Sequence, residues 1–176
     1  MKKMILKSTL LIAAVFFYLH IAYAQEKQYK VGCIAFYNLE NLYDTINDPD
    51  KNDEEFTPNG KSSWTSERYN KKIKNLSEVI SQVGDEYVKG GPAIMGISEV
   101  ENKQVVEDLI SAPALKSSNY GIVHYDSPDR RGVDVALIYQ KEHFKVLNSN
   151  HVKLSISGNP GFASRDQLVV SGIFDG

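Results

Sequence analysis

Residues 93–102 read Ala-Ile-Met-Gly-Ile-Ser-Glu-Val-Glu-Asn, an apolar run that ends in two carboxylates and an amide. The apolar run predicts a buried strand. An unpaired carboxylate is costly to bury, whereas a divalent cation such as Mg²⁺ takes oxygen ligands from one or two carboxylates. Glu99 is therefore a candidate metal ligand, the alternative being an acid that favours the N-terminus of the next helix. Glu101 and Asn102 are expected to cap that helix or to hydrogen-bond the metal's waters.

An earlier strand is predicted over residues 31–38, and it leads into Phe36-Tyr37-Asn38-Leu39-Glu40-Asn41. The most regular helix is predicted between the two strands, over residues 66–88, with Thr65 or Ser66 as its N-cap. A single crossover helix joins neighbouring parallel strands. Asn38 and Glu99 are therefore expected to lie close together in the fold.

The remaining elements predict an α/β (α+β) domain with a mixed sheet. A polar loop over residues 40–63 is interpreted as a solvated acidic surface loop. A short helix is expected near 103–110, and strands are expected over residues 120–125, 133–139, 144–153 and 167–174. This order suggests helices on one face of the sheet. The other face must also be covered, because strands 93–97 and 133–139 are apolar on both sides.

The first 24 residues predict a secretory signal peptide, which places the domain at residues 25–176. Lysines at 2, 3 and 7 precede the apolar run 10–17, and Ala22-Tyr23-Ala24 supplies a small-x-small cleavage pattern. The alternative is a membrane anchor, for which the charge-free stretch 8–24 is short. We expect export to the periplasm or beyond the cell, with no membrane association after cleavage. Losing the three lysines lowers the formal charge from −2 to −5, which is no basic footprint for nucleic acid.

Cys33 is the only cysteine, so a disulfide framework is absent. We expect it to be a small buried core residue.

Three segments together resemble the endonuclease/exonuclease/phosphatase superfamily, the DNase I-like phosphodiesterases, and most closely its secreted bacterial nucleases. They are residues 36–41, residues 97–102 and Arg130-Arg131-Gly132-Val133-Asp134-Val135-Ala136-Leu137-Ile138-Tyr139. The resemblance implies an α/β/β/α four-layer sandwich, of which this chain is expected to cover the N-terminal half, truncated at its C-terminus. It implies Mg²⁺, or Mn²⁺ or Ca²⁺ in its place, held by Asn38 and Glu99. For Asn38 the alternative is a turn residue.

The resemblance also implies phosphodiester hydrolysis, most simply by a nuclease with nucleic acid as its substrate and no stable protein partner. One alternative is a phosphatase or a sphingomyelinase-like enzyme of the same superfamily, since fold alone does not decide among them. The other is an inactive truncated product or a binding module. The sequence leaves open the substrate, endo- against exonuclease action and the oligomeric state.

Three further residues are candidates for phosphate binding or for supporting the site. Arg131 lies at a turn and is either a phosphate contact or a solvated arginine. Asp134 interrupts an apolar strand and needs a partner, which we expect to be Arg165 or Arg131. Arg165 opens the last predicted strand in Ser164-Arg165-Asp166, which is similar to the Thr-Arg-Asp segment of related secreted members.

The family's Asn-His, Gly-Asp-x-Asn and Ser-Asp-His motifs do not occur in the 176 residues. His124 and His151 are expected to be surface or satisfied core residues rather than catalysts. Because proton transfer needs positioned acid and base groups, this chain alone is expected to be inactive.

Overall fold

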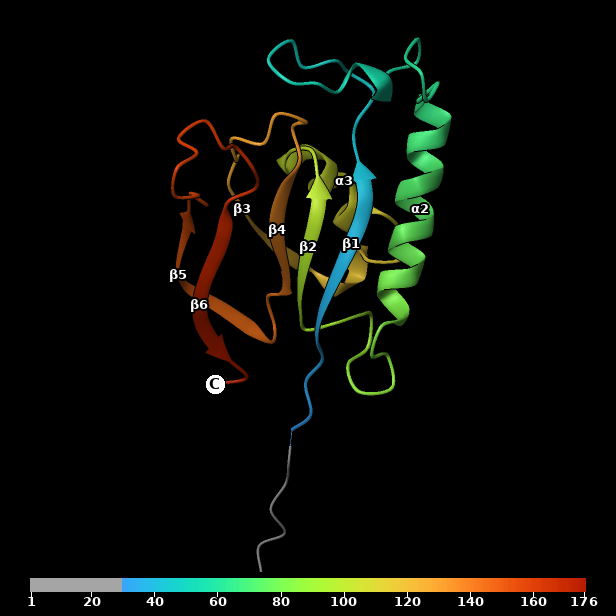
Figure 1. The fold of residues 1–176 in the computed structure, drawn as a ribbon. Coiled ribbons are helices and arrows are strands. Elements are labelled where there is room, and N and C mark those ends of the chain that lie inside the picture. Colours follow the sequence, from blue (N-terminus) through green and yellow to red (C-terminus); the bar gives the residue numbers. More distant parts are fainter. Residues whose placement is uncertain (1–29) are drawn as a thin grey trace, which may run out of the picture. The chain divides into compact units, whose positions relative to one another are not determined.

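The computed structural model describes residues 30–176, and its centre is a mixed four-stranded sheet (Figure 1). The strand order is β1-β2-β4-β3, with β1 and β2 parallel and the other pairs antiparallel. The strands are Ile34–Leu42 (β1), Ile94–Val100 (β2), Tyr120–His124 (β3) and Asp134–Gln140 (β4). The predicted mixed sheet is confirmed. β1 and β2 run past Asn38 and Ile97, where the sequence predicted their ends.

Two α-helices cover one face of this sheet: α2 (Ser66–Gln82) and α3 (Lys103–Ser111). Thr65 caps α2 by accepting a hydrogen bond from the backbone N–H of Arg68. The helix ends at Gln82 rather than at residue 88, because Gly84 adopts a left-handed φ of 69° that an α-helix cannot contain. Short 3₁₀ turns, η1 (Glu54–Phe56) and η2 (Lys116–Ser118), lie in the connections.

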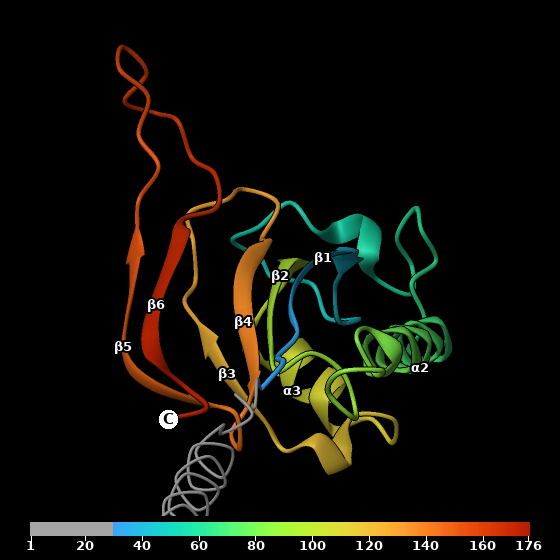
Figure 2. The same cartoon turned by 90° about the horizontal axis from the view of Figure 1, so that it is seen from below.

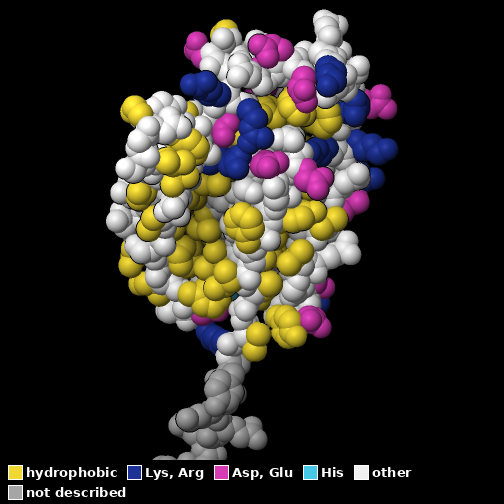
Figure 3. All heavy atoms as spheres, viewed as in Figure 1, with side chains coloured by type: hydrophobic (Ala, Val, Ile, Leu, Met, Phe, Trp, Pro, Cys, Tyr) yellow, Lys and Arg dark blue, Asp and Glu magenta, His cyan; other side chains and the backbone are white. Residues whose placement is uncertain are grey.

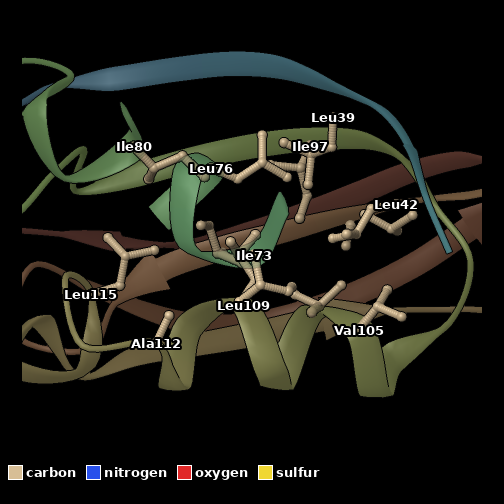
Figure 4. Close-up of a cluster of buried hydrophobic side chains, with 14 of the residues drawn as sticks. Leu39, Leu42, Ile73, Leu76, Ile80, Ile97, Val105, Leu109, Ala112 and Leu115 are labelled. Carbon is tan, nitrogen blue, oxygen red and sulfur yellow. The ribbon is translucent and has the colours of Figure 1, made fainter. Parts of the chain in front are cut away.

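The hydrophobic core lies between these helices and the inner face of the sheet. Figure 4 shows side chains from the helices and from strands β1 and β2 meeting there, among them Leu39, Leu42, Ile73, Leu76, Ile80, Ile97, Val105 and Leu109. Leu42, Ile80 and Leu109 are fully buried. Burying one such side chain stabilises a fold by about 1.5–3 kcal/mol. The packed helix layer therefore holds β1 and β2 at fixed positions.

A second, two-stranded antiparallel sheet lies against the opposite face, formed by β5 (Phe144–Val152) and β6 (Gln167–Phe174). Figure 2 shows the three layers in cross-section: helices, the main sheet, and the β5–β6 pair beside β4. This arrangement is compatible with part of a DNase I-like α+β sandwich, as the sequence predicted.

Part of the outer face stays open beside β6. Side chains of Ile34 and Phe36 on β1 are 70% and 71% exposed. Figure 3 shows hydrophobic side chains gathered over this side of the molecule.

The loop after β1 is less solvated than the sequence predicted. The ring of Tyr43 stacks on Phe56 at 4.1 Å, and the indole N–H of Trp64 donates to the carbonyl of Tyr43 at 3.0 Å. Asp53 is only 2% exposed. Cys33 also differs from its prediction, because it precedes β1 and is half-buried rather than buried in the core.

The predicted signal peptide, residues 1–24, lies outside the described residues. Within residues 30–176, no helix has the length and apolar character needed to cross a membrane.

Candidate metal and phosphate site

The candidate site lies where the regular pairing of β1 and β2 breaks. Asn38 is in register with Ser98, the residue before Glu99, and pairing resumes only at Leu42 and Val100. Asn38 and Glu99 therefore sit next to each other on neighbouring parallel strands, as predicted.

Three non-glycine residues adopt left-handed backbone conformations in this break. The φ angles are 52° at Glu40, 63° at Asn41 and 60° at Glu99. Each such residue costs on the order of 1–3 kcal/mol, and clusters of them mark functional sites. Glu99 is also the extra residue of a bulge against β4, since Ser98 and Val100 pair with the consecutive residues Val135 and Asp134.

Asn38 has an exposed side chain whose amide oxygen accepts the backbone N–H of Glu40 at 2.8 Å. This is the turn contact that the alternative interpretation predicted. It is compatible with a metal ligand, because an amide oxygen carries two lone pairs. Glu99, one residue beyond the register partner of Asn38, is half-buried.

Lys72 of helix α2 connects the helix layer to this break. Its ammonium group donates to the backbone carbonyls of Glu40 and of Asn41, the latter at 3.2 Å. Burial lowers the pKa of Lys72, and the carboxylates of Glu40 and Glu99 oppose that shift. The sequence showed Lys72 only as one lysine on the polar side of a helix, so its role was missed.

Both candidate arginines lie beside a carboxylate that the sequence did not single out, Asp129. Arg131 Nε lies 3.5 Å and Arg165 Nη1 lies 3.7 Å from its oxygens. Asp129 is 6% exposed, and its turn position gave no signal of burial. The buried Nη1 of Arg165 has no hydrogen-bond partner within the described part of the chain. Arg165 also lines a groove of about 600 Å³ between the outer face and β6.

The predicted pairing of Asp134 with an arginine is wrong. Asp134 Oδ2 lies 3.0 Å from Nε2 of His124, and Oδ1 accepts the backbone N–H and the hydroxyl of Ser127. The reason is strand alternation. Asp134 faces the helix side together with Ala136 and Ile138, whereas Arg165 lies on the opposite face of the sheet.

Glu101 and Asn102 have separate structural roles. Asn102 caps α3 by accepting the backbone N–H of Val105 at 3.1 Å, as expected. Glu101 does not cap this helix but accepts the backbone N–H of Asp44 at 2.6 Å. Burial raises the pKa of Glu101 to about 8; this hydrogen bond opposes the shift, and the carboxylates of Asp44 and Asp53 reinforce it.

The donors at the break suit a hard cation. Asn38, Glu40 and Glu99 offer only oxygen atoms, which is the ligand type that Mg²⁺, Mn²⁺ and Ca²⁺ prefer. Behind the break, Lys72 holds the backbone carbonyls of Glu40 and Asn41.

The chain is an α/β protein with a helical layer on a mixed sheet, and oxygen-bearing side chains lie at the break in the pairing of its two parallel strands. Residues 33–176 match the model of the endonuclease/exonuclease/phosphatase family, and the chain belongs to that family. The domain is therefore of a phosphodiesterase or nuclease type within a superfamily of hydrolases. No curated protein matches the chain.

Proposed function

We propose that this chain forms the metal-binding part of an exported, divalent-metal-dependent phosphodiester hydrolase acting on nucleic acid. The observation that supports it best is the placement of Asn38 beside Glu99 in a left-handed break of two parallel strands. Export rests on the N-terminal sequence pattern alone.

Glu99 and Asn38 would hold Mg²⁺, with Mn²⁺ or Ca²⁺ as substitutes. Such an ion, when bound, polarises a phosphoryl oxygen and offsets its charge. Lys72 keeps the β1 backbone in the conformation that presents these donors. Nη1 of Arg165, which makes no hydrogen bond within the described residues, could turn from Asp129 to a phosphate, and Arg131 is 52% exposed at the neighbouring turn.

Among the described residues, we find the least support for groups that could transfer protons in the reaction. Each imidazole within residues 30–176 lies beside an aspartate: His124 with Asp134 at 3.0 Å, His143 with Asp175 at 2.9 Å and His151 with Asp166 at 2.8 Å. None of these pairs belongs to the break at Asn38 and Glu99. We therefore propose that the chain alone binds the metal but hydrolyses phosphodiesters poorly, because water activation needs a positioned base.

The test compares Glu99→Gln with Glu142→Gln, a control at an exposed carboxylate in the turn between β4 and β5. Calorimetric titration with Mg²⁺ and Mn²⁺ should show at least a tenfold loss of affinity in Glu99→Gln and no change in the control. Plasmid nicking by the parent chain should stay near background. If Glu99→Gln leaves the metal affinity unchanged, the proposed site is wrong. If the parent chain nicks plasmid DNA strongly in the presence of metal, the proposed lack of turnover is wrong.

A further inference from the structure

A second group of potential ligands lies at the end of β3, on the helix side of the sheet. The ligand atoms of His124, Asp126 and Asp134 all lie within 4.8 Å of one another. The His124 side chain is only 3% exposed, and its Nε2 lies 3.0 Å from Asp134 Oδ2. Asp134 Oδ1 is already occupied by two hydrogen bonds from Ser127. Asp134 therefore acts as a fixed acceptor that holds the imidazole ring.

Within residues 30–176, the other ring nitrogen of His124 makes no such hydrogen bond. The carboxylate oxygen Oδ1 of Asp126 lies 3.9 Å from Nδ1, which is too far for a hydrogen bond. When Nε2–H donates to Asp134, the neutral ring carries a lone pair at Nδ1. The Nδ1 lone pair and the Asp126 carboxylate are close enough together for one cation to bind both.

We propose that Nδ1 of His124 and the carboxylate of Asp126 bind a transition-metal ion of the Zn²⁺ class, with Asp134 as the residue that positions the imidazole. A carboxylate that accepts the far N–H of a ligating histidine fixes the ring and raises its basicity, as in many zinc sites. Imidazole with carboxylate and water suits Zn²⁺ better than Mg²⁺, which prefers oxygen alone.

The distance also fits. Two ligands at zinc bond lengths of about 2.1 Å in a tetrahedral site lie about 3.4 Å apart. The observed 3.9 Å needs only a small movement of Asp126, whose side chain is 92% exposed and free to turn.

The surroundings favour a cation. Asp126 and Asp134 line a hollow of about 450 Å³ whose walls also carry the acidic residues Asp44, Asp48, Asp50 and Glu101. Lys51 is the lysine in this lining, and its ammonium group is held 3.3 Å from the carbonyls of Ser127 and Asp129. Because the pKa of Glu101 is raised to about 8, the negative charge of the hollow comes from its aspartates, which outnumber Lys51 and concentrate a cation there.

This site does not rest on the proposed hydrolase function. It contains a nitrogen donor, whereas the site at Asn38 and Glu99 has only oxygen donors. The first is therefore expected to prefer Zn²⁺ and the second Mg²⁺, so a metal titration distinguishes them.

The test is titration of the metal-stripped chain with Co²⁺, whose visible absorption reports a nitrogen and oxygen site, and then with Zn²⁺ against a chromophoric chelator. Both titrations are run in excess Mg²⁺ to occupy any oxygen-only site. We expect Asp126→Asn to weaken zinc binding at least tenfold without loss of fold, since the residue is exposed. Asp134→Asn should weaken it by about 10- to 100-fold, while Glu99→Gln should leave it unchanged. Circular dichroism checks that each variant is folded.

NMR of the histidine ring nitrogens provides a second measurement, which would not change if His124 had only a structural role. Zn²⁺ should shift the Nδ1 resonance of His124 and leave those of His143 and His151 in place. Zinc affinity that is equal in the parent and Asp126→Asn, or that is lost in Glu99→Gln, overturns the proposal. So does an unchanged His124 spectrum at saturating zinc.

Discussion

At the scale of single residues, Lys72 determines how the site is supported. Its ammonium group donates to the carbonyls of two successive left-handed residues, Glu40 and Asn41, and its nitrogen lies 5.7 Å from the centroid of the Trp64 ring. A hydrogen bond that involves a charged group contributes about 1.5–3 kcal/mol, and here part of that offsets the cost of burying the amine.

Lys72→Met keeps the apolar stem and removes only the ammonium group. We expect it to lower the free energy of unfolding by about 1–2 kcal/mol and to weaken Mg²⁺ binding, because the backbone next to Glu99 loosens. Lys71→Met is the control, since Lys71 is the exposed neighbour on the same helix. Urea unfolding and calorimetry give the two quantities. Equal effects of both substitutions would show that the carbonyl contacts contribute nothing.

Single residues also show where sequence interpretation stops. The sequence correctly required a partner for Asp134 but could not say which one, because the choice depends on the face of β4 and on the β3–β4 register. That register aligns His124 with Ala136, which puts the imidazole on the same face as Asp134. Arg165 comes from a segment on the other face. The burial of Asp129 and Asp53 has the same kind of cause, since tertiary packing rather than local pattern removes them from water.

At the scale of elements, strong periodicity or alternation allowed good predictions. The strands at Gln167–Phe174 and Phe144–Val152 and the helix at Lys103–Ser111 agree with the prediction within one residue. The ends of β1, β2 and α2 did not. Helix α2 stops before Gly84, which has a positive φ angle, whereas β1 and β2 continue beyond the left-handed residues Glu40, Asn41 and Glu99 to Leu42 and Val100. Apolar periodicity continues past Gly84, so the pattern alone extends the helix too far.

The end of α2 provides a test of that explanation. A methyl group at Gly84 would meet the Sγ of Cys33 at 2.4 Å, in addition to the strain of a φ of 69°. Gly158 has a similar φ of 80° but no atom within 4 Å of such a methyl group. We expect Gly84→Ala to cost about 2–4 kcal/mol of stability and Gly158→Ala about 1 kcal/mol. Chemical unfolding measures both.

Cys33→Ala removes the sulfur but keeps the Cβ, which the methyl group would meet at 2.9 Å. The cost of Gly84→Ala in that background should therefore fall part of the way towards that of Gly158→Ala. A double-mutant cycle gives the coupling directly. Equal costs at both glycines in the parent chain would mean that backbone strain alone ends the helix.

At the scale of the whole molecule, the layers explain both the confirmed fold class and its exposed surface. Helices α2 and α3 bury the inner face, while β5 and β6 cover only the part of the outer face beside β4. Apolar residues on both sides of β2 and β4 predicted a covering on each face. The side chains of Ile34 and Phe36 remain largely in solvent, and contiguous apolar surface of this kind promotes association.

We expect the chain to self-associate in a concentration-dependent way through this surface, and Phe36→Thr to weaken that association by at least about tenfold. Burying one phenylalanine contributes about 1.5–3 kcal/mol, and 1.4 kcal/mol corresponds to a factor of ten. Thr suits an exposed strand position, so the free energy of unfolding should change little. Val79→Thr is the matched control, because Val79 is an exposed residue on helix α2, 46% exposed, away from the sheet. Sedimentation velocity on chains of identical length measures the association. The prediction is wrong if the parent chain stays monomeric at all concentrations or if both variants associate equally. Either result would show that the open sheet face does not mediate self-association.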